Sequence, residues 1–432
     1  MARPVPSPDH GAAETGKAAA PQVRPAQHVP AMAYGPDPAA KDTGMTRGEK
    51  GPTMGVEEEY FLIDPASRTV VPAGSLVLRR AADILCDRVS GELTEYQFEA
   101  KTPPCTGLDA LRAQLAGIRT AVVAAAAAEG LGVAASGTPV LAAHGPAPIR
   151  DDPAYRPGLD AYRALNDTYA LCALHTHVQV PDLDHAVLVC NHLRPWLPLL
   201  VALSANSPFW EGRDTGYASW RTVAGGQWPV AGPPPYFTSA DHYKQLCATL
   251  TETGAAVGDH TLLWDVRPSA HLPTVEIRVM DVPTRLEETA ALAALVRALV
   301  ARALERVTGG DPGPQVCPAL LRAAYWRSAR DGCSGDALDL RSGALVPVSR
   351  LVRDLVDHAR PALDEYGELA PVTAVLGELT GRGGAERQRA AFARRSRPAD
   401  VVDELIRQTA SVPAVQEAGG MAAAGGAGLS CT

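Results

Sequence analysis

Polar and apolar side chains alternate in several stretches of the chain, and this alternation predicts β-strands. Because successive side chains of a strand point to opposite faces, residues two apart share a face. A short apolar run at 131–136 predicts a buried strand, and 68–71 a short return strand after the Asp64-Pro65 turn. The alternating stretches are residues 54–64, 92–105, 173–182 and 264–283.

A helical rhythm of apolar residues appears between these strands. Leucine, isoleucine and valine recur every three or four residues from 108 to 122, after a Thr106-x-x-Asp109 sequence typical of a capping box. The same arrangement follows Thr284-x-x-Glu287 as far as Gly309. We expect these helices to form a layer that supports the strands. Further helices are expected near residues 76–85, 161–171, 185–204, 318–331, 348–363 and 385–409.

Acidic side chains recur on the predicted strands. Glu57 and Glu59 share one face of the first strand, Glu99 lies on the second, and Glu276 on the last. Neighbouring carboxylates raise each other's pKa and weaken a fold unless a cation or water compensates them. A solvated edge strand would also explain Glu57 and Glu59. Convergence of the acids would instead create a site for a hard cation.

A pair of histidines lies on the strand at 173–182. His175, His177 and Gln179 share one face of this strand. A lone histidine on a strand is more often structural than a ligand, but two at this spacing favour a binding site. Both interpretations stay open from the sequence alone.

Three arginines are candidates for binding anions. Arg213 and Arg221 lie in a polar loop rich in glycine and serine, and Arg278 shares a face with Glu276. A guanidinium can hold a carboxylate or phosphate through two hydrogen bonds. The alternatives are solvated loop arginines and a simple pair between Arg278 and Glu276.

Composition narrows the class of protein. The 432 residues are 46% hydrophobic, enough for a large core in one or two domains. A net charge of -8 and the lack of Lys/Arg runs argue against nucleic-acid binding. Eight cysteines without a Cys-x-x-Cys pair suggest reduced thiols in a cytoplasmic protein. We find no secretory signal and no apolar run of membrane-spanning length, so no membrane partner is expected.

The ends of the chain differ in composition from its middle. Residues 1–50 contain almost no large apolar side chains, and residues 412–432 are rich in alanine and glycine. Such segments cannot offset the entropy of ordering. We therefore expect a disordered extension at 1–50, a catalytic domain at 51–411 and a disordered tail at 412–432.

The candidate ligands indicate a particular chemistry. Carboxylates with an occasional imidazole, and no thiolate, suit Mg²⁺ or Mn²⁺ better than zinc. Hard cations beside arginines are what nucleoside triphosphate chemistry uses. The chain has no Walker-type loop and no Gly-x-Gly-x-x-Gly after a strand, which argues against a P-loop or Rossmann fold.

Five ordered segments carry a resemblance. They are GVEEEYFLIDP, Gln-x-Glu followed by TPPC, HTHVQVPD, LSANSPFWEGRDTGYASWR and RPSAHLPTVEIRVMDVP. Together they resemble the carboxylate-amine ligases of the glutamate-cysteine ligase type 2 family over about residues 54–407. The resemblance implies an α+β, glutamine synthetase-like catalytic fold. In this fold a curved antiparallel sheet holds ATP and metal ions on its concave face, with helices behind.

The resemblance also implies roles for the candidate residues. ATP and Mg²⁺ or Mn²⁺ would be the cofactors. Arg278 would contact the transferred phosphate and act in catalysis with Glu57, while His175 or His177 would contact nucleotide or metal. Arg221 would bind a substrate carboxylate, with Arg213 and Gln179 as further substrate contacts. The implied metal ligands are Glu57, Glu59, Glu99 and Glu276.

The implied reaction joins a small carboxylic acid to an amino acid-like amine through an acyl phosphate. The chain departs from the family at Gln179, where relatives have glycine, at 224–229, and at 136–145. We therefore expect substrates diverged from glutamate and cysteine. A guanidino-type kinase on the same sheet and a catalytically silent binding protein are the alternatives. A homo-oligomer is one option that the sequence leaves open.

Overall fold

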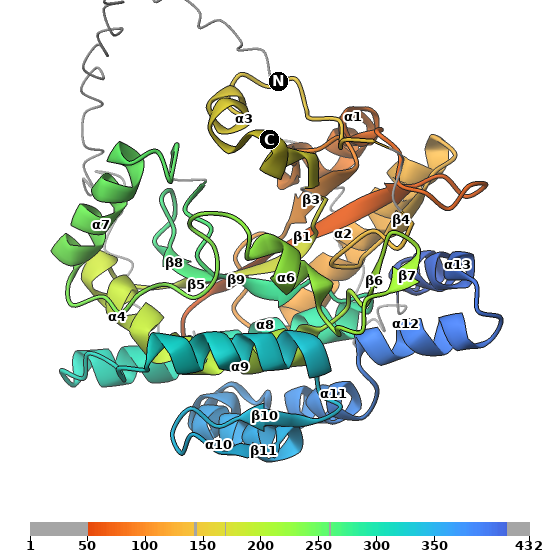
Figure 1. The fold of residues 1–432 in the computed structure, drawn as a ribbon. Helices are drawn as coiled ribbons and strands as arrows, with labels where there is room; N and C mark the ends of the chain where they lie inside the picture. The colour runs from red at the N-terminus through yellow and green to blue at the C-terminus, as the bar shows by residue number, and fades with distance from the viewer. Residues whose placement is uncertain (1–50, 142–144, 169, 259–260, 413–432) are drawn as a thin grey trace, which may run out of the picture. The chain divides into compact units, whose positions relative to one another are not determined.

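The structure is a computed structural model that describes residues 51–141, 145–168, 170–258 and 261–412 (Figure 1). The expected extension at 1–50 and the expected tail from residue 413 onward lie outside the described residues. All elements below belong to the unit that begins at Glu49.

A seven-stranded antiparallel sheet forms the centre of this unit, in the order β2-β3-β1-β5-β9-β8, with β4 also paired to β1. A register shift between Leu174 and Thr176 interrupts the pairing of β5 with β9. Such irregularities bend a strand and contribute to a curved sheet. The strands are β1 (Met54–Ile63), β2 (Val89–Gly91), β3 (Gln97–Lys101), β4 (Gly132–Ala134), β5 (Ala173–Gln179), β8 (Val266–Pro268) and β9 (Thr274–Asp281).

Helices cover one face of the sheet. Helix α8 (Leu286–Thr308) contacts β1 and β5, α2 (Leu108–Ala128) contacts β3 and β4, and α5 (Leu197–Ser204) contacts β9. Apolar residues on this face, among them Val56, Leu174 and Ile277, are buried in the main core. Since alternate residues point to the other face, the strands direct the candidate site acids, Glu57, Glu59, Glu99 and Glu276, away from this helical layer.

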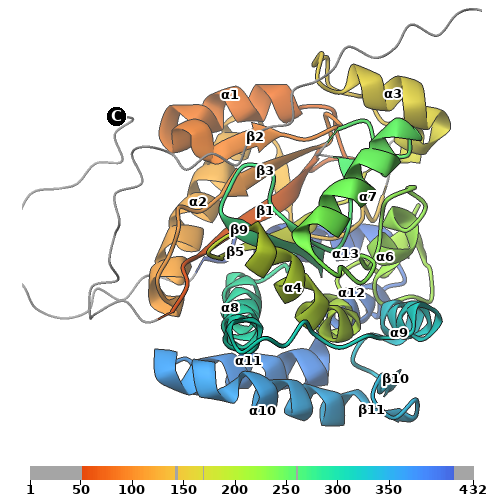
Figure 2. The same ribbon diagram turned by 90° about the vertical axis from the view of Figure 1, so that its left-hand side faces the viewer.

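The remaining helices surround this arrangement (Figures 1 and 2). Helices α10 (Val348–Tyr366) and α11 (Leu369–Arg382) pack against α8, whereas α3 (Arg156–Tyr162) lies on the opposite side of the sheet. Two small antiparallel hairpins lie outside the main sheet. They are β6 (Phe209–Trp210) with β7 (Arg213–Asp214), and β10 (Asp336–Leu338) with β11 (Leu345–Pro347). The other helices are α1 (Gly74–Leu85), α4 (Leu183–Leu193), α6 (Trp220–Gly225), α7 (Ala240–Glu252), α9 (Pro318–Asp331), α12 (Gly384–Ala393) and α13 (Pro398–Thr409).

Several local predictions are wrong. The strand expected at 92–105 is confined to Gln97–Lys101, and 68–71 contributes one isolated bridge, between Ile63 and Val70. Neither predicted capping box forms, because α2 and α8 have no side-chain cap. The first backbone N–H of α2 donates instead to Glu368 Oε1 at 2.7 Å, a partner too distant in sequence to be foreseen.

Two expectations from composition need correction. The stretch Leu183–Ser204 is long and apolar enough to cross a membrane, but most of it is buried inside the protein, as in a core helix. The expectation of reduced thiols holds for six described cysteines, whereas Cys86 is bonded in a disulfide.

Candidate active site

Strand pairing brings the predicted acids and histidines together. Glu59 lies opposite Glu99, Glu57 opposite His175, and Glu276 opposite His177. The polar face expected from the alternation therefore exists and extends across four neighbouring strands. These strands are β3, β1, β5 and β9, which are neighbours in this order in the sheet.

His175 occupies the centre of this group. Its Nδ1 lies 3.3 Å from Glu57 Oε2 and 3.9 Å from Glu276 Oε1, and its Nε2 lies 3.5 Å from Glu59 Oε1. Burial and the charge of Arg278 lower the pKa of His175 to about 4. The imidazole is therefore neutral near pH 7 and keeps a lone pair available for a ligand.

These side chains line a cavity of about 700 Å³ between the sheet and α3, which we call the acidic cavity. Its size falls within the range of small-molecule sites. Its charged and histidine lining consists of Glu57, Glu59, Glu92, Glu99, Lys101, His175, His177, Arg267, His271, Glu276 and Arg278.

Basic side chains offset part of the negative charge. Arg278 pairs with Glu276, and Arg267 Nε donates to Glu276 Oε2 at 2.8 Å. Burial alone would raise the pKa of Glu276, but the two guanidinium groups hold it well below its usual range. Lys101 Nζ lies 2.7 Å from Glu99 and 3.6 Å from Glu57.

Three other acids remain poorly compensated, whereas, against the effect of burial, hydrogen bonds with His175 and His177 hold the pKa of Glu57 well below its usual range. Burial raises the pKa of Glu59 to about 7, even though Arg221 and Arg278 act in the opposite direction. Burial and the charge of Glu57 raise the pKa of Glu99, and burial with the charge of Glu59 raises that of Glu92. Added positive charge in the cavity would therefore stabilise the ionised carboxylates.

The arrangement fits divalent cations. Ligand atoms lie within 4.8 Å of one another in two groups, Glu57 with His175 and Glu276, and Glu59 with Glu99 and His175. In addition, the buried His177 Nε2 lies 3.6 Å from Glu57 Oε1. Carboxylates with imidazole suit Mg²⁺ or Mn²⁺.

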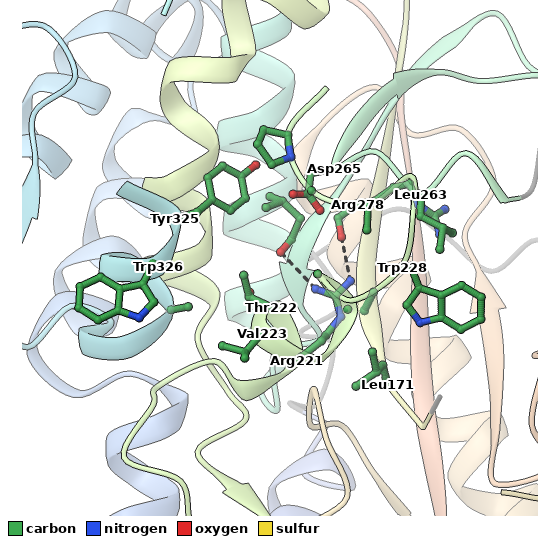
Figure 3. A pocket seen from close by; sticks show the side chains of 18 of the residues that line it. Leu171, Arg221, Thr222, Val223, Trp228, Leu263, Asp265, Arg278, Tyr325 and Trp326 are labelled. Carbon is green, nitrogen blue, oxygen red and sulfur yellow. Dashed lines mark hydrogen bonds between the residues drawn. The ribbon is translucent and has the colours of Figure 1, made fainter. Parts of the chain in front are cut away.

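A second cavity of about 370 Å³ adjoins the first and shares Glu59, His175, Arg278, Trp228 and Leu263 with it. We call it the tryptophan pocket, because Trp228 and Trp326 stand at two of its walls (Figure 3). Arg221 lines this pocket and donates to the carbonyl oxygens of Val279 and Arg278 at 3.2 and 3.0 Å.

Two predicted substrate contacts lie elsewhere. Gln179 is exposed at the end of β5, where its Oε1 accepts a hydrogen bond from Thr53 Oγ1 at 3.2 Å. Arg213 is exposed on the small strand β7 (Arg213–Asp214). Neither residue lines the acidic cavity or the tryptophan pocket.

Sequence reasoning missed several residues of the site. Lys101 lies two residues after Glu99, so the alternation that identified the acid could also have identified the lysine. Arg267 lies opposite Glu276 on β8, a pairing that needs the register. Glu92 and Asp265 lie outside the observed strands, and the alternation predicted over 92–105 and 264–283 does not put them on the faces of Glu99 and Glu276.

The antiparallel sheet, with helices on one face and clustered acids, histidines and arginines on the other, has the glutamine synthetase-like fold that the resemblance implies. The profile of the glutamate-cysteine ligase family 2 matches residues 53–414. The chain belongs to this family and is an ATP-dependent ligase that forms carbon–nitrogen bonds.

Relatives and solved structures agree with this assignment. The chain is 44% identical over 359 residues to a protein of Mycolicibacterium vanbaalenii named "Putative glutamate--cysteine ligase 2-2", covering 83% of this chain and 98% of the relative. A Saccharopolyspora erythraea relative, "Putative glutamate--cysteine ligase 2-1", is 43% identical over 362 residues, covering 83% of this chain and 94% of the relative.

Similarity of fold extends to more distant proteins. The glutamate–cysteine ligase of Francisella tularensis, solved in complex with AMP, has a TM-score of 0.64 at 13% identity and covers 84% of this chain and 90% of that one. The bifunctional glutathione synthetase of Pasteurella multocida has a TM-score of 0.61 at 14% identity, covering 83% of this chain and 52% of that one.

Proposed function

We propose that the enzyme activates a small carboxylic acid by phosphorylation and then joins it to an amine. A carboxylate oxygen attacks the γ-phosphorus of ATP, the bond between that phosphorus and the bridging oxygen breaks, and ADP leaves. The amine nitrogen then attacks the carbonyl carbon of the acyl phosphate. The carbon–oxygen bond to phosphate breaks, the nitrogen loses a proton, and the products are an amide and inorganic phosphate.

The observation that carries this proposal is the convergence of Glu57, Glu59, Glu99 and Glu276 with Arg278 on one cavity. Phosphorylating a carboxylate brings two anions together, so the site must supply compensating positive charge. The AMP complex of the Francisella tularensis ligase, which has a similar fold, supports a nucleotide in such a cavity.

Mg²⁺ or Mn²⁺ would be held by the two histidines, His175 and His177, and by four acids, Glu57, Glu59, Glu99 and Glu276. When bound there, such ions would supply positive charge that offsets the charge of the triphosphate. Arg278, held against Glu276, would stabilise the charge on the transferred phosphoryl group.

Amino acid-like substrates follow from the family. We infer that they differ from glutamate and cysteine, because part of the divergent segment 224–229, including Gly225, Gly226 and Trp228, lines the tryptophan pocket. Divergence at Gln179 does not support this inference, since Gln179 lines neither cavity.

The test measures ADP release with a panel of carboxylic acids and amines in the presence of Mg²⁺. For the best pair, label in the carboxylate oxygens should appear in the released phosphate, because an acyl phosphate transfers one of these oxygens. Glu57→Gln should abolish both signals, while Glu378→Gln, a change at an exposed acid on α11, should leave them intact.

Absence of label in the phosphate during amide formation would contradict the acyl phosphate. Robust turnover with glutamate and cysteine would remove the case for diverged substrates.

A further inference from the structure

The tryptophan pocket has mostly apolar walls. Figure 3 shows Trp228, Leu263 and Leu171 on one side of Arg221, and Val223 with Trp326 on the other. A cavity of about 370 Å³ is large enough for a small organic ligand. A free cysteine side chain would leave most of these walls uncovered.

Two polar groups lie at one end of these walls. Tyr325 is 6% exposed, and its hydroxyl lies beside the Asp265 carboxylate, to which it donates a hydrogen bond. The hydroxyl therefore helps to hold this carboxylate at the wall of the pocket.

Asp265 is the second polar group. Its backbone is fixed on both sides, since its N–H donates to the carbonyl of Gly232 at 2.9 Å and its carbonyl accepts from the Arg278 N–H at 2.8 Å. Its side chain borders the pocket beside Tyr325 (Figure 3) and accepts a hydrogen bond from the Tyr325 hydroxyl.

The charges around Asp265 leave room for a cation. Arg221 lies 3.8 Å from Asp281 and donates to backbone carbonyls, and Arg278 pairs with Glu276. Burial raises the pKa of Asp265 to about 6, although Arg221 acts in the opposite direction. A bound ammonium group would stabilise the ionised carboxylate.

The position of the pocket connects it to the chemistry. It opens to the acidic cavity at Glu59, His175 and Arg278, the residues beside which an acid would be activated. A ligand in the pocket therefore lies next to the reacting centre and borders Glu59 and His175, two of the residues that would hold metal.

We propose that the tryptophan pocket binds the amine substrate, and that this amine is a primary ammonium compound with an aromatic or branched apolar side chain. The carboxylate of Asp265 and the hydroxyl of Tyr325 receive the ammonium group, and Trp228 and Leu263 cover the apolar part. This assignment rests on the proposed amide-forming function and specifies the class of its amine.

Equilibrium binding tests the proposal without turnover. Phenethylamine, phenethyl alcohol and cysteine are titrated into the full-length protein by calorimetry, without nucleotide. We expect phenethylamine to bind more tightly than cysteine, and the alcohol, which lacks the charge, to bind at least about tenfold more weakly than the amine.

Variants connect this binding to the pocket. Asp265→Asn should weaken the binding of phenethylamine at least about tenfold. It should leave the binding of an ATP analogue unchanged, which also shows that the variant is folded. Val223→Trp should exclude phenethylamine by filling the pocket. Asp241→Asn, a change at an exposed acid of α7, is the control and should bind like the wild type.

Two results would overturn the proposal: unchanged phenethylamine binding by Asp265→Asn, or tighter binding of cysteine than of phenethylamine. Failure of the amide-forming reaction is a separate outcome. In that case no labelled phosphate appears, while amine binding still depends on Asp265.

Discussion

Replacing Glu58 by glutamine should strongly destabilise the protein, because Glu58 forms a buried ion pair behind the active-site strand. Glu58 and Arg119 are each 1% exposed. Arg119 Nε donates to Glu58 Oε2 at 3.0 Å, and a second guanidinium nitrogen donates to Glu58 Oε1. Thr289 Oγ1 also donates to Oε1 at 2.6 Å.

The size of this destabilisation follows from the partners that Arg119 keeps when Glu58 is replaced. Its remaining partners are the carbonyls of Pro283 and Thr284 and the Thr289 hydroxyl, none of which carries a negative charge. Removing one member of a buried ion pair costs about 3–5 kcal/mol. This is a large part of the roughly 5–15 kcal/mol by which proteins are stable.

Urea unfolding, followed by circular dichroism, measures this loss. Glu58→Gln should lower the free energy of unfolding by about 3–5 kcal/mol, and Glu378→Gln should change it by less than about 0.5 kcal/mol. Adding Arg119→Met to Glu58→Gln should recover much of the loss, because no unpaired charge then remains buried. A single-variant loss below about 1 kcal/mol, or no recovery in the double variant, would refute the reasoning.

Three further predictions concern other parts of the site and its support. Lys101→Met removes a cation from Glu99 and Glu57. In thermal scans, Mg²⁺ should therefore raise the melting temperature of this variant more than that of the wild type. Equal shifts in the two proteins would count against a metal site at these acids. Gly137→Ala should lower the free energy of unfolding in urea by about 1–3 kcal/mol, since the added Cβ would meet the Asp281 carboxylate carbon at 2.7 Å. Gly117→Ala, with open space around the added Cβ, should instead raise the free energy of unfolding by about 0.5–1 kcal/mol. Similar losses in both variants would contradict this reasoning. Because burial raises the pKa of Asp265 to about 6 against the effect of Arg221, the folded protein keeps a proton that the unfolded chain releases near pH 4. The contribution of this carboxyl to the free energy of unfolding therefore falls as pH rises from about 4 to about 6. Across that interval the free energy of unfolding of Asp265→Asn should rise by up to about 3 kcal/mol relative to that of the wild type. Parallel pH profiles of stability in the two proteins would show that the pKa shift is absent.

Alternation along single strands predicted the acidic face of the sheet well. Glu57, Glu59 and Glu276 all point into the acidic cavity, because the two-residue period of a strand fixes the face of each side chain. The same rule put Glu58 on the opposite face, where it meets Arg119. Strand faces are a local property, so a local pattern is enough to find them.

Features that depend on distant partners could not be predicted in this way. The start of α2 is capped by Glu368, 260 residues away, so the local capping box at Thr106 was misleading. Asp265, just before β8, and Tyr325 on α9 are distant in sequence but line the same pocket. Gln179 and Arg213 were selected for residue type and local context, which do not determine distance from a cavity.

Calorimetric binding of a non-hydrolysable ATP analogue, with and without Mg²⁺, tests most directly whether the clustered acids form a metal–nucleotide site. We expect binding that requires Mg²⁺, is lost in Glu57→Gln and persists in Glu378→Gln. Equal affinity with and without the ion, or unchanged affinity in Glu57→Gln, would contradict it.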